Sequence, residues 1–153
     1  MPAPLEKTAL PEGIRARFVN DINGLTMHVL EAGFESKGRP CVLLLHGFPE
    51  LAYSWRKVML PLAQAGFHVV APDQRGYGRT TGWDGRYDGD LDSYRVMNLV
   101  QDCLALLERL ETLLLEAGAA LASPAAGSAL GRITGASKTA RIAARLLARP
   151  AHP

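Results

Sequence analysis

The pattern of apolar positions predicts short strands that alternate with turns and helical segments. Residues 14–19 and 25–30 alternate apolar and polar side chains on either side of Asn23-Gly24, which predicts two antiparallel strands joined by a hairpin turn. Cys41–Leu45 is apolar without interruption, as expected of a strand buried on both faces of a parallel sheet. Phe67–Ala71 predicts another short apolar strand. Together these segments predict an α/β fold.

Two helical segments complete the pattern. Ser54 is expected to cap a helix that Pro61 kinks or restarts, and that Gly66 ends. A longer helix is expected to follow a cap at Asp92 or Ser93. Its apolar residues recur every three or four positions and predict one stripe that faces the core: Val96, Leu99, Val100, Cys103, Leu107, Leu110 and Leu114.

The loops that follow the two apolar strands carry candidate chemistry, because open α/β sheets place their sites at the carboxyl ends of strands. In His46-Gly47-Phe48-Pro49, glycine and proline shape a turn that can aim the backbone N–H of Phe48 at a developing negative charge. On these residues alone, a simple strand-ending turn is an equal alternative. In Asp73–Gly78, an ion pair between Asp73 and Arg75 is favoured over direct catalysis by Asp73. His28, within the second hairpin strand, is expected to be structural.

The charge distribution divides the chain near residue 116. The sequence holds 17 Lys+Arg and 15 Asp+Glu, for a net charge of +2, but residues 117–153 contain five basic residues and no acidic one. Residues 1–116 are therefore predicted to be the folded domain, and residues 117–153 an Ala/Gly/Arg-rich tail of low complexity or adventitious origin. Within that tail, Ala136–Leu147 can form a basic helix, but we expect no binding to nucleic acid or to a membrane.

Other features predict neither cofactor nor metal. Cys41 and Cys103 lie in apolar patterns and are expected to be buried free thiols. The acidic segment Thr80–Asp92 lacks the alternating ligands and closing glutamate of a calcium loop, so a solvated loop is expected. No apolar run approaches about 18 residues and no signal peptide is evident, so a cytoplasmic protein without a membrane span is expected.

Three motifs in combination closely resemble the start of the epoxide hydrolases, which have the α/β-hydrolase fold. They are H-G-F-P-E-L-A-Y-S-W-R at residues 46–56, A-Q-A-G-F at residues 63–67, and D-Q-R-G-Y-G at residues 73–78. The similarity runs from about Gly13 to Leu110. It implies the N-terminal portion of an α/β-hydrolase core, with hairpin strands followed by strand, helix, strand and helix, and therefore an incomplete sheet.

The resemblance also implies a substrate and a mechanism. In the family a small-molecule epoxide is opened by an aspartate in a G-x-D-x-G turn, a late histidine activates water to hydrolyse the resulting ester, and lid tyrosines donate to the epoxide oxygen. Phe48 would supply the oxyanion N–H, in a loop shaped by His46, Gly47 and Pro49.

The groups that would start this reaction are missing from the sequence. It contains no G-x-D-x-G turn, and Ser128 is not in a G-x-S-x-G elbow because Ala126 and Leu130 occupy the glycine positions. The four histidines and four tyrosines lack the family context of a catalytic base or lid acid: His28, His46, His68, His152, Tyr53, Tyr77, Tyr87 and Tyr94. We therefore expect a truncated chain that is inactive alone, with a possible shift of reading frame after Glu116.

Truncation has a physical consequence for the strand before His46. In the family's strand order, Cys41–Leu45 would lie between the Phe67–Ala71 strand and the absent nucleophile strand. Without that neighbour it becomes an exposed edge, which predicts self-association through unpaired backbone groups.

Several alternatives stay open. The chain can be a non-catalytic remnant or interaction module instead of part of an enzyme. A haloalkane dehalogenase is less favoured, because Phe48-Pro49-Glu50 and Tyr53-Ser54-Trp55-Arg56 favour the epoxide hydrolases. Serine esterases share the fold and stay open as well, since the elbow that could exclude them is absent from the sequence.

Overall fold

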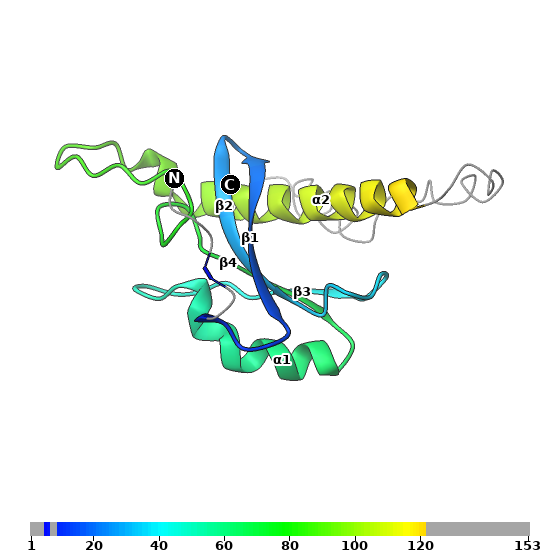
Figure 1. Cartoon of the computed structure of the whole chain (residues 1–153). Coiled ribbons are helices and arrows are strands. Elements are labelled where there is room, and N and C mark those ends of the chain that lie inside the picture. The colour runs from blue at the N-terminus through cyan, green and yellow to red at the C-terminus, as the bar shows by residue number, and fades with distance from the viewer. Residues whose placement is uncertain (1–4, 7–8, 122–153) are drawn as a thin grey trace, which may run out of the picture. The chain divides into compact units, whose positions relative to one another are not determined.

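A computed structural model describes residues 5–6 and 9–121. The chain divides into two compact units, Met1–Glu111 and Thr112–Pro153. A four-stranded sheet with the strand order β1-β2-β4-β3 is the centre of the first unit (Figure 1). The predicted tail lies outside the described residues from position 122 onward, and this includes the possible basic helix Ala136–Leu147 and Ser128. Within the described ranges, no helix combines the length and apolar character that a membrane crossing requires.

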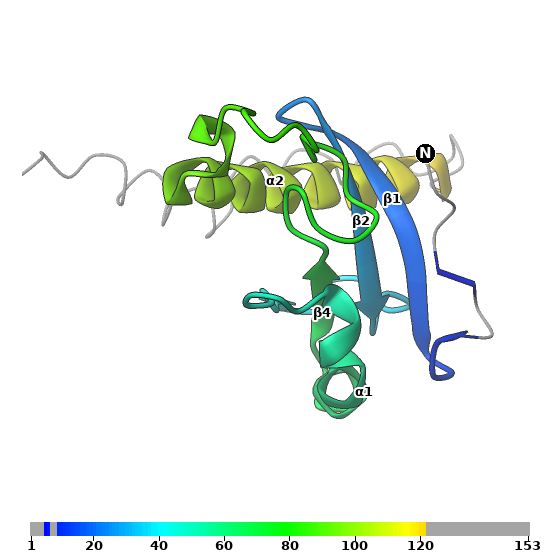
Figure 2. The ribbon, with the colours of Figure 1, turned by 90° about the vertical axis from the view of Figure 1, so that its left-hand side faces the viewer.

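Strands β1 (Ile14–Ile22) and β2 (Leu25–Ala32) form the predicted antiparallel hairpin (Figure 2). Ile22 pairs with Leu25, so Asn23 and Gly24 alone make the turn, with φ values of 49° and 76°. Positive φ at both central positions is what such a two-residue hairpin turn requires, and asparagine and glycine tolerate it best. The predicted hairpin turn at Asn23-Gly24 is confirmed.

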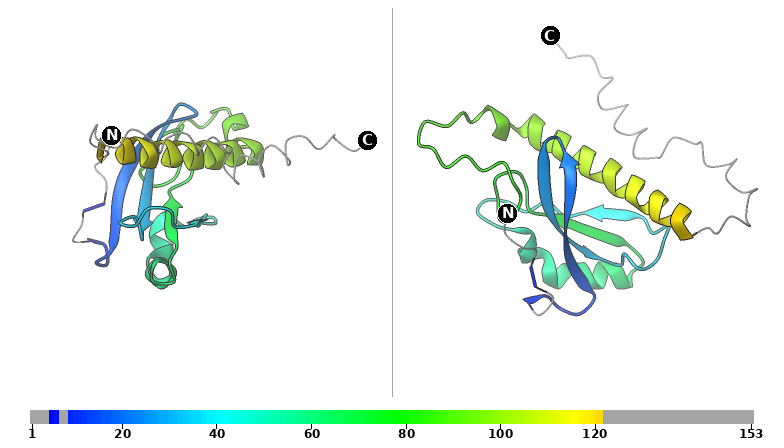
Figure 3. Two further views of the ribbon diagram at one scale, coloured as in Figure 1. Left: turned by 90° about the vertical axis from the view of Figure 1, so that its right-hand side faces the viewer. Right: turned by 45° about the horizontal axis from the view of Figure 1, so that its top comes forward.

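Strand β4 (His68–Pro72) lies between the hairpin and β3 (Cys41–Leu43), antiparallel to β2 and parallel to β3. β3 is the edge of the sheet (Figure 3, right), and Cys41 is exposed while its two successors are half-buried. The prediction of a strand buried on both faces is therefore wrong: within the described residues, β3 has a neighbouring strand on one side alone. The prediction that this strand forms an exposed edge is confirmed.

Helix α1 (Arg56–Gln64) covers one face of the sheet. Its buried Met59 packs in a core cluster with apolar residues that alternate along β2 and β4: Leu30, Ala32, Val69 and Ala71. Burial of these side chains fixes which face of each strand points towards α1.

The start and the middle of α1 differ from the prediction. A 3₁₀ helix, η2 (Ala52–Trp55), precedes α1, and the Ser54 hydroxyl donates to the carbonyl of Leu51 (2.7 Å) instead of capping the helix. Pro61 lies inside the continuous helix, so the alternative of a fresh helical start at Pro61 is wrong. Pro61 and Lys57 are exposed, which lets water satisfy the Lys57 carbonyl that proline leaves unpaired. As predicted, the helix ends before Gly66, which has φ 94°.

Helix α2 (Val96–Leu121) begins after η3 (Asp92–Tyr94), so neither Asp92 nor Ser93 is its cap. The predicted apolar stripe is only partly right, because Val96 and Val100 are 73% and 43% exposed. Among the described side chains of this helix, the buried ones follow each other at intervals of four: Asp102, Leu106 and Leu110. The buried face thus includes a charged residue, Asp102, which a prediction from apolar residues alone leaves out.

The two cysteines are free, but they are less buried than predicted. Cys41 is exposed on the edge strand and Cys103 is half-buried on α2. Burial, together with the nearby negative charge of Asp102, raises the pKa of Cys103 to about 11, so this thiol stays protonated at neutral pH.

The sheet face opposite α1 contains a fully buried carboxylate, Glu31 on β2. Its Oε2 accepts hydrogen bonds from Nε of Arg15 (2.8 Å) and Nε of Arg17 (2.7 Å), both on β1. His68 Nε2 lies 3.3 Å from Oε1, a contact too poorly aligned to satisfy that nitrogen. Burial alone would raise the pKa of Glu31, but the contacts with His68 and Arg17 and the charges of both arginines hold it well below its usual range.

Replacing this carboxylate tests the contribution of the cluster. We expect Glu31→Gln to lower the free energy of unfolding at pH 7 by about 3 kcal/mol, because it leaves buried polar partners without their charge. Since folding lowers the pKa of Glu31, its stabilisation is complete above the ordinary glutamate pKa of about 4.3 and is lost as the pH falls further. Urea unfolding at pH 7 and pH 3 measures both effects, and the gap between variant and wild type should shrink at pH 3.

The exposed Glu35, three residues beyond the end of β2, supplies the matched control. Glu35→Gln should change the unfolding free energy by less than about 0.5 kcal/mol. Equal effects of the two substitutions would contradict a special role for the buried cluster.

Candidate functional site

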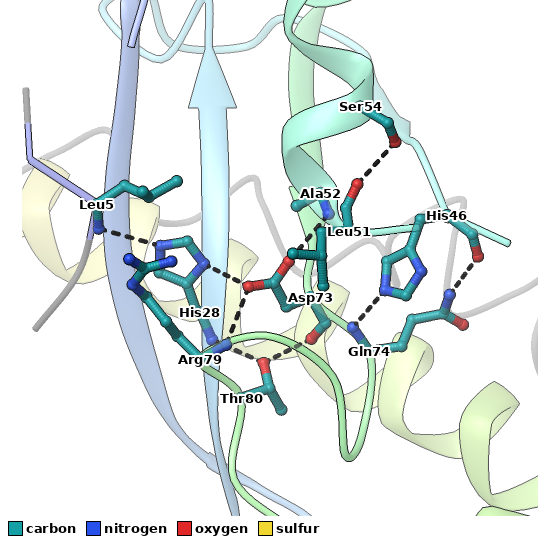
Figure 4. Close-up of polar contacts among 10 residues, drawn as sticks. All are labelled: Leu5, His28, His46, Leu51, Ala52, Ser54, Asp73, Gln74, Arg79 and Thr80. Atoms are coloured by element: carbon teal, nitrogen blue, oxygen red, sulfur yellow. Dashed lines mark hydrogen bonds and ion pairs between the residues drawn. The ribbon is translucent and has the colours of Figure 1, made fainter. Parts of the chain in front are cut away.

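Two loops meet at the carboxyl ends of β3 and β4, because these strands are parallel and their carboxyl ends point the same way. Residues 46–51 follow the end of the β3 segment, and residues 73–80 follow β4. Figure 4 shows the polar contacts that join these loops to each other and to β2.

The carboxylate of Asp73, 3% exposed as a residue, is the centre of these contacts. Its Oδ2 accepts hydrogen bonds from His28 Nδ1 (2.9 Å) and from the backbone N–H of Arg79 (3.2 Å), and its Oδ1 accepts one from the backbone N–H of Ala52 (2.9 Å). Burial would raise the pKa of Asp73, but these bonds, led by that from His28, outweigh it and lower the pKa. A carboxylate held by three donors is an anchor and a poor nucleophile.

The predicted ion pair between Asp73 and Arg75 is wrong. Arg75 instead forms a bidentate ion pair with Asp102 on α2, in which its Nε and Nη2 each donate to one carboxylate oxygen at 2.8 Å. Asn23 of the hairpin turn donates to the same carboxylate (3.1 Å). Sequence proximity favoured Asp73, but that carboxylate accepts its hydrogen bonds from His28, Ala52 and Arg79 instead.

His28 is fully buried and supports Asp73 from β2. Its Nδ1 faces the carboxylate, so it carries the proton in this hydrogen bond, and its Nε2 lies 3.5 Å from the backbone N of Leu5. Thr80 adds a further link, since its hydroxyl accepts from the backbone N–H of His28 (3.0 Å) and donates to the carbonyl of Asp73 (2.5 Å). These contacts give His28 a supporting position.

His46 joins the first loop to the second. Its Nε2 accepts a hydrogen bond from the backbone N–H of Gln74 (3.0 Å), and its Nδ1 donates to the carbonyl of Gly47 (3.0 Å). This pattern assigns the neutral tautomer with the proton on Nδ1. The ring also packs edge-on against Tyr77, with 5.0 Å between centroids. Both ring nitrogens are therefore occupied, and His46 is not free to act as a base.

Phe48 lies at the exposed part of this loop. Its residue is 85% exposed, and its peptide bond to Pro49 is cis. The carbonyl of Gly47 accepts a hydrogen bond from the backbone N–H of Glu50 (2.9 Å), which closes a turn around Phe48. Among the residues that the structure describes, none accepts a hydrogen bond from the Phe48 N–H. This donor is available to an external acceptor.

The structure thus places the four predicted site residues, His46, Gly47, Phe48 and Pro49, in one loop, and it adds supports that sequence reasoning missed. Gln74 donates a hydrogen bond to His46 of this loop, and the N–H of Ala52, just beyond the loop, donates to Asp73. Asp102 anchors the neighbouring loop through Arg75. Asp102 alone had a sequence signal: an acidic residue between the apolar residues of a core-facing helix requires a buried partner.

The acidic segment Thr80–Asp92 contains local ion pairs. Asp84 pairs with Arg86 (2.7 Å), and Asp92 pairs with Arg95 (2.6 Å). In the described part of the chain, no group of three histidine, cysteine or acidic side chains is arranged to hold a metal ion.

Comparisons with known proteins agree with this geometry. Residues 40–112 match the alpha/beta hydrolase fold family. The chain is 47% identical over 88 residues to epoxide hydrolase A of Mycobacterium tuberculosis, covering 58% of this chain and 25% of that protein. It is 44% identical over 96 residues to the AB hydrolase superfamily protein YfhM of Bacillus subtilis, covering 63% and 31%. The chain therefore spans less than a third of the length of these relatives.

Solved structures show the same relationship. Epoxide hydrolase A of Mycobacterium thermoresistibile superimposes with a TM-score of 0.55 and 41% identity, over 64% of this chain and 28% of that one. Potato epoxide hydrolase I gives a TM-score of 0.53 and 46% identity, over 62% and 27%. The predicted resemblance to the N-terminal part of the epoxide hydrolases, and the predicted α/β-hydrolase fold, are confirmed.

Gly78 provides a direct test of the Asp73 anchor. It has φ 54°, and a Cβ added there would lie 2.6 Å from Cγ of Asp73. We expect Gly78→Ala to lower the free energy of unfolding by about 3 kcal/mol, since it adds backbone strain and displaces a buried carboxylate from its donors. Chemical denaturation measures the change.

Gly38→Ala is the control for backbone strain alone. Gly38 has φ 76° and open space around the position of a Cβ. Its substitution should cost about 1 kcal/mol. If Gly78→Ala lowered the free energy of unfolding no more than this control, the close approach of residue 78 to Asp73 would not contribute to stability.

Proposed function

Because this chain has the N-terminal part of the α/β-hydrolase fold, we propose that it supplies the oxyanion-binding part of an epoxide hydrolase active site. The backbone N–H of Phe48 is the donor, and His46, Gly47 and Pro49 shape its loop. The Phe48 N–H, which has no acceptor among the described residues and belongs to an exposed residue, is the observation that carries the proposal, because an oxyanion donor must be free before charge develops. The identities of 41–47% to named epoxide hydrolases support that substrate class.

In the proposed reaction, an aspartate attacks an epoxide carbon and forms an alkyl ester as the C–O bond of the ring breaks and an acid protonates the released oxygen. Water activated by a histidine then adds to the ester carbonyl. The negative charge that develops on the carbonyl oxygen is stabilised by the Phe48 N–H, and collapse releases the diol. The buried Asp73 is not the nucleophile here, since all its hydrogen bonds hold it in the framework.

The 153 residues do not complete this reaction alone in our proposal, because the sequence contains no G-x-D-x-G turn to supply the nucleophile. Epoxide turnover should be measured on the 153-residue chain and on the polypeptide isolated from the source cell, whose intact mass is compared with 16.5 kDa. We expect diol from a longer native polypeptide and none from the 153-residue chain. Diol formed by the 153-residue chain would refute the assignment of the missing groups.

Removing the N–H of Phe48 tests its role in the polypeptide that turns over epoxide. Phe48→Pro should slow hydrolysis of the covalent ester by about 10²- to 10³-fold, because it deletes one oxyanion donor. Single-turnover kinetics with quenched-flow detection of the ester measure this step. Phe48→Ala keeps the N–H and alters an exposed side chain, so its ester hydrolysis should remain within a few-fold of wild type.

Replacement of the Phe48 amide by a backbone ester, through semisynthesis, deletes the same N–H without a proline ring. Rapid ester hydrolysis in both N–H-deleted forms would rule out Phe48 as the oxyanion donor.

The exposed edge of β3 favours a second candidate function, that of an interaction module that associates with copies of itself. Two backbone hydrogen bonds join this strand to β4. The carbonyl of Pro40 accepts from the N–H of His68 (3.0 Å), and the N–H of Leu44 donates to the carbonyl of Val70 (2.9 Å). Since the N–H and C=O of one residue point to the same side of a strand, Cys41 and Leu43 of β3 direct theirs to the open edge. Leu45 is also 43% exposed. An open edge of this composition is a template for pairing.

A charge at the edge tests this association. Leu45→Lys should shift the chain towards monomer by at least about tenfold in its dissociation constant, because strand pairing would bury the ammonium group. Light scattering coupled to size-exclusion chromatography measures the mass over a concentration series. Leu91→Lys is the control, since Leu91 is 74% exposed and lies outside the sheet. A monomeric wild-type chain at all concentrations would eliminate this function.

A further inference from the structure

The Phe48 loop is bound at both of its ends by two consecutive residues of the second loop. Upstream of Phe48, His46 is held by Gln74, and downstream of it, Ala52 is held by the Asp73 carboxylate (Figure 4). Residues 47–51 lie between these two points. From this arrangement we propose that Gln74 is a positioning residue for the Phe48 N–H, with Asp73 as its counterpart at the other end of the loop. The inference rests on the proposed role of Phe48 as oxyanion donor.

Gln74 makes two separate hydrogen bonds to His46. Its backbone N–H donates to the ring Nε2 (3.0 Å), and its side-chain Nε2 donates to the His46 carbonyl (2.5 Å). The ring bond fixes the imidazole, whereas the carbonyl bond fixes the main chain two residues before Phe48. A hydrogen bond to a backbone atom restricts the following peptide planes more than a hydrogen bond to a side chain that can still rotate.

The downstream point is anchored more deeply. Asp73 binds Ala52 with one carboxylate oxygen while His28 and Arg79 hold the other, so its side chain is fixed from three directions. Ala52 itself is fully buried and begins the 3₁₀ helix η2. With Ala52 fixed in this way, the orientation of the exposed Phe48 depends on whether the upstream end is also held. The bond from the Gln74 side chain is the one that holds the His46 carbonyl at this upstream end, so we expect it to contribute most to the rigidity of the donor.

Backbone order parameters measured by ¹⁵N relaxation on the 153-residue chain test this role. In wild type, we expect the Phe48 amide to have an order parameter near 0.85, the value of rigid backbone. Gln74→Met, which keeps the length of the side chain and deletes its donor, should lower it below about 0.6. Gln74→Glu should do the same at pH 7, because its carboxylate faces the His46 carbonyl oxygen.

Two controls separate positioning from general loosening. Gln64→Met alters an exposed glutamine at the end of α1 and should leave the Phe48 amide rigid. The Val70 amide in β4 should stay rigid in every variant.

A rigid Phe48 amide in both Gln74 variants would overturn the positioning role, and so would an equal loss of order at Val70. This outcome is distinct from failure of the proposed function. If Phe48→Pro hydrolysed the ester as fast as wild type, Phe48 would not be the oxyanion donor, whatever the order parameters showed.

Discussion

The buried carboxylate of Asp73 is the constraint on which the rest of the site depends. A charged group removed from water is tolerated when hydrogen bonds replace its hydration, and Asp73 obtains them from three places in the sequence: His28, Ala52 and Arg79. Each donor must keep its place, because a withdrawn donor leaves buried charge uncompensated. The carboxylate therefore fixes the relative positions of β2, the start of η2 and the loop after β4.

The next two residues extend this constraint to further elements. Gln74 binds His46 in the loop after β3, and Arg75 binds Asp102 on α2, which also receives a hydrogen bond from Asn23 in the hairpin turn. Successive side chains of an extended or turning segment point in different directions, so three neighbours can bind three separate partners. A short stretch at the end of one strand thereby holds most of the described elements of the first unit, and the candidate oxyanion loop is one of them.

Local chemistry explains which parts of this arrangement were predictable from the sequence. The Asn23-Gly24 turn, the two loops after apolar strands and the end of α1 at Gly66 follow from backbone preferences of a few adjacent residues. The partners of Asp73 and Arg75 were not predictable in this way, because the choice between Arg75, His28 and Asp102 is made by strands and helices far apart in the sequence. The same is true of α2, whose buried face includes Asp102 and so departs from the apolar periodicity.

The burial of β3 was mispredicted for a related reason. A run of apolar residues favours a buried strand, but burial also requires neighbouring strands, and the run itself does not show that they are present. This bears on the candidate site. The hydrogen bonds that join His46 and Ala52 to the loop after β4 come from Gln74 and Asp73, on the side of β3 that faces β4. The geometry of the Phe48 loop is therefore specified independently of whatever pairs with that edge. In the function that we propose, the donor N–H would therefore be positioned by one side of the sheet, next to an edge that is open on the other.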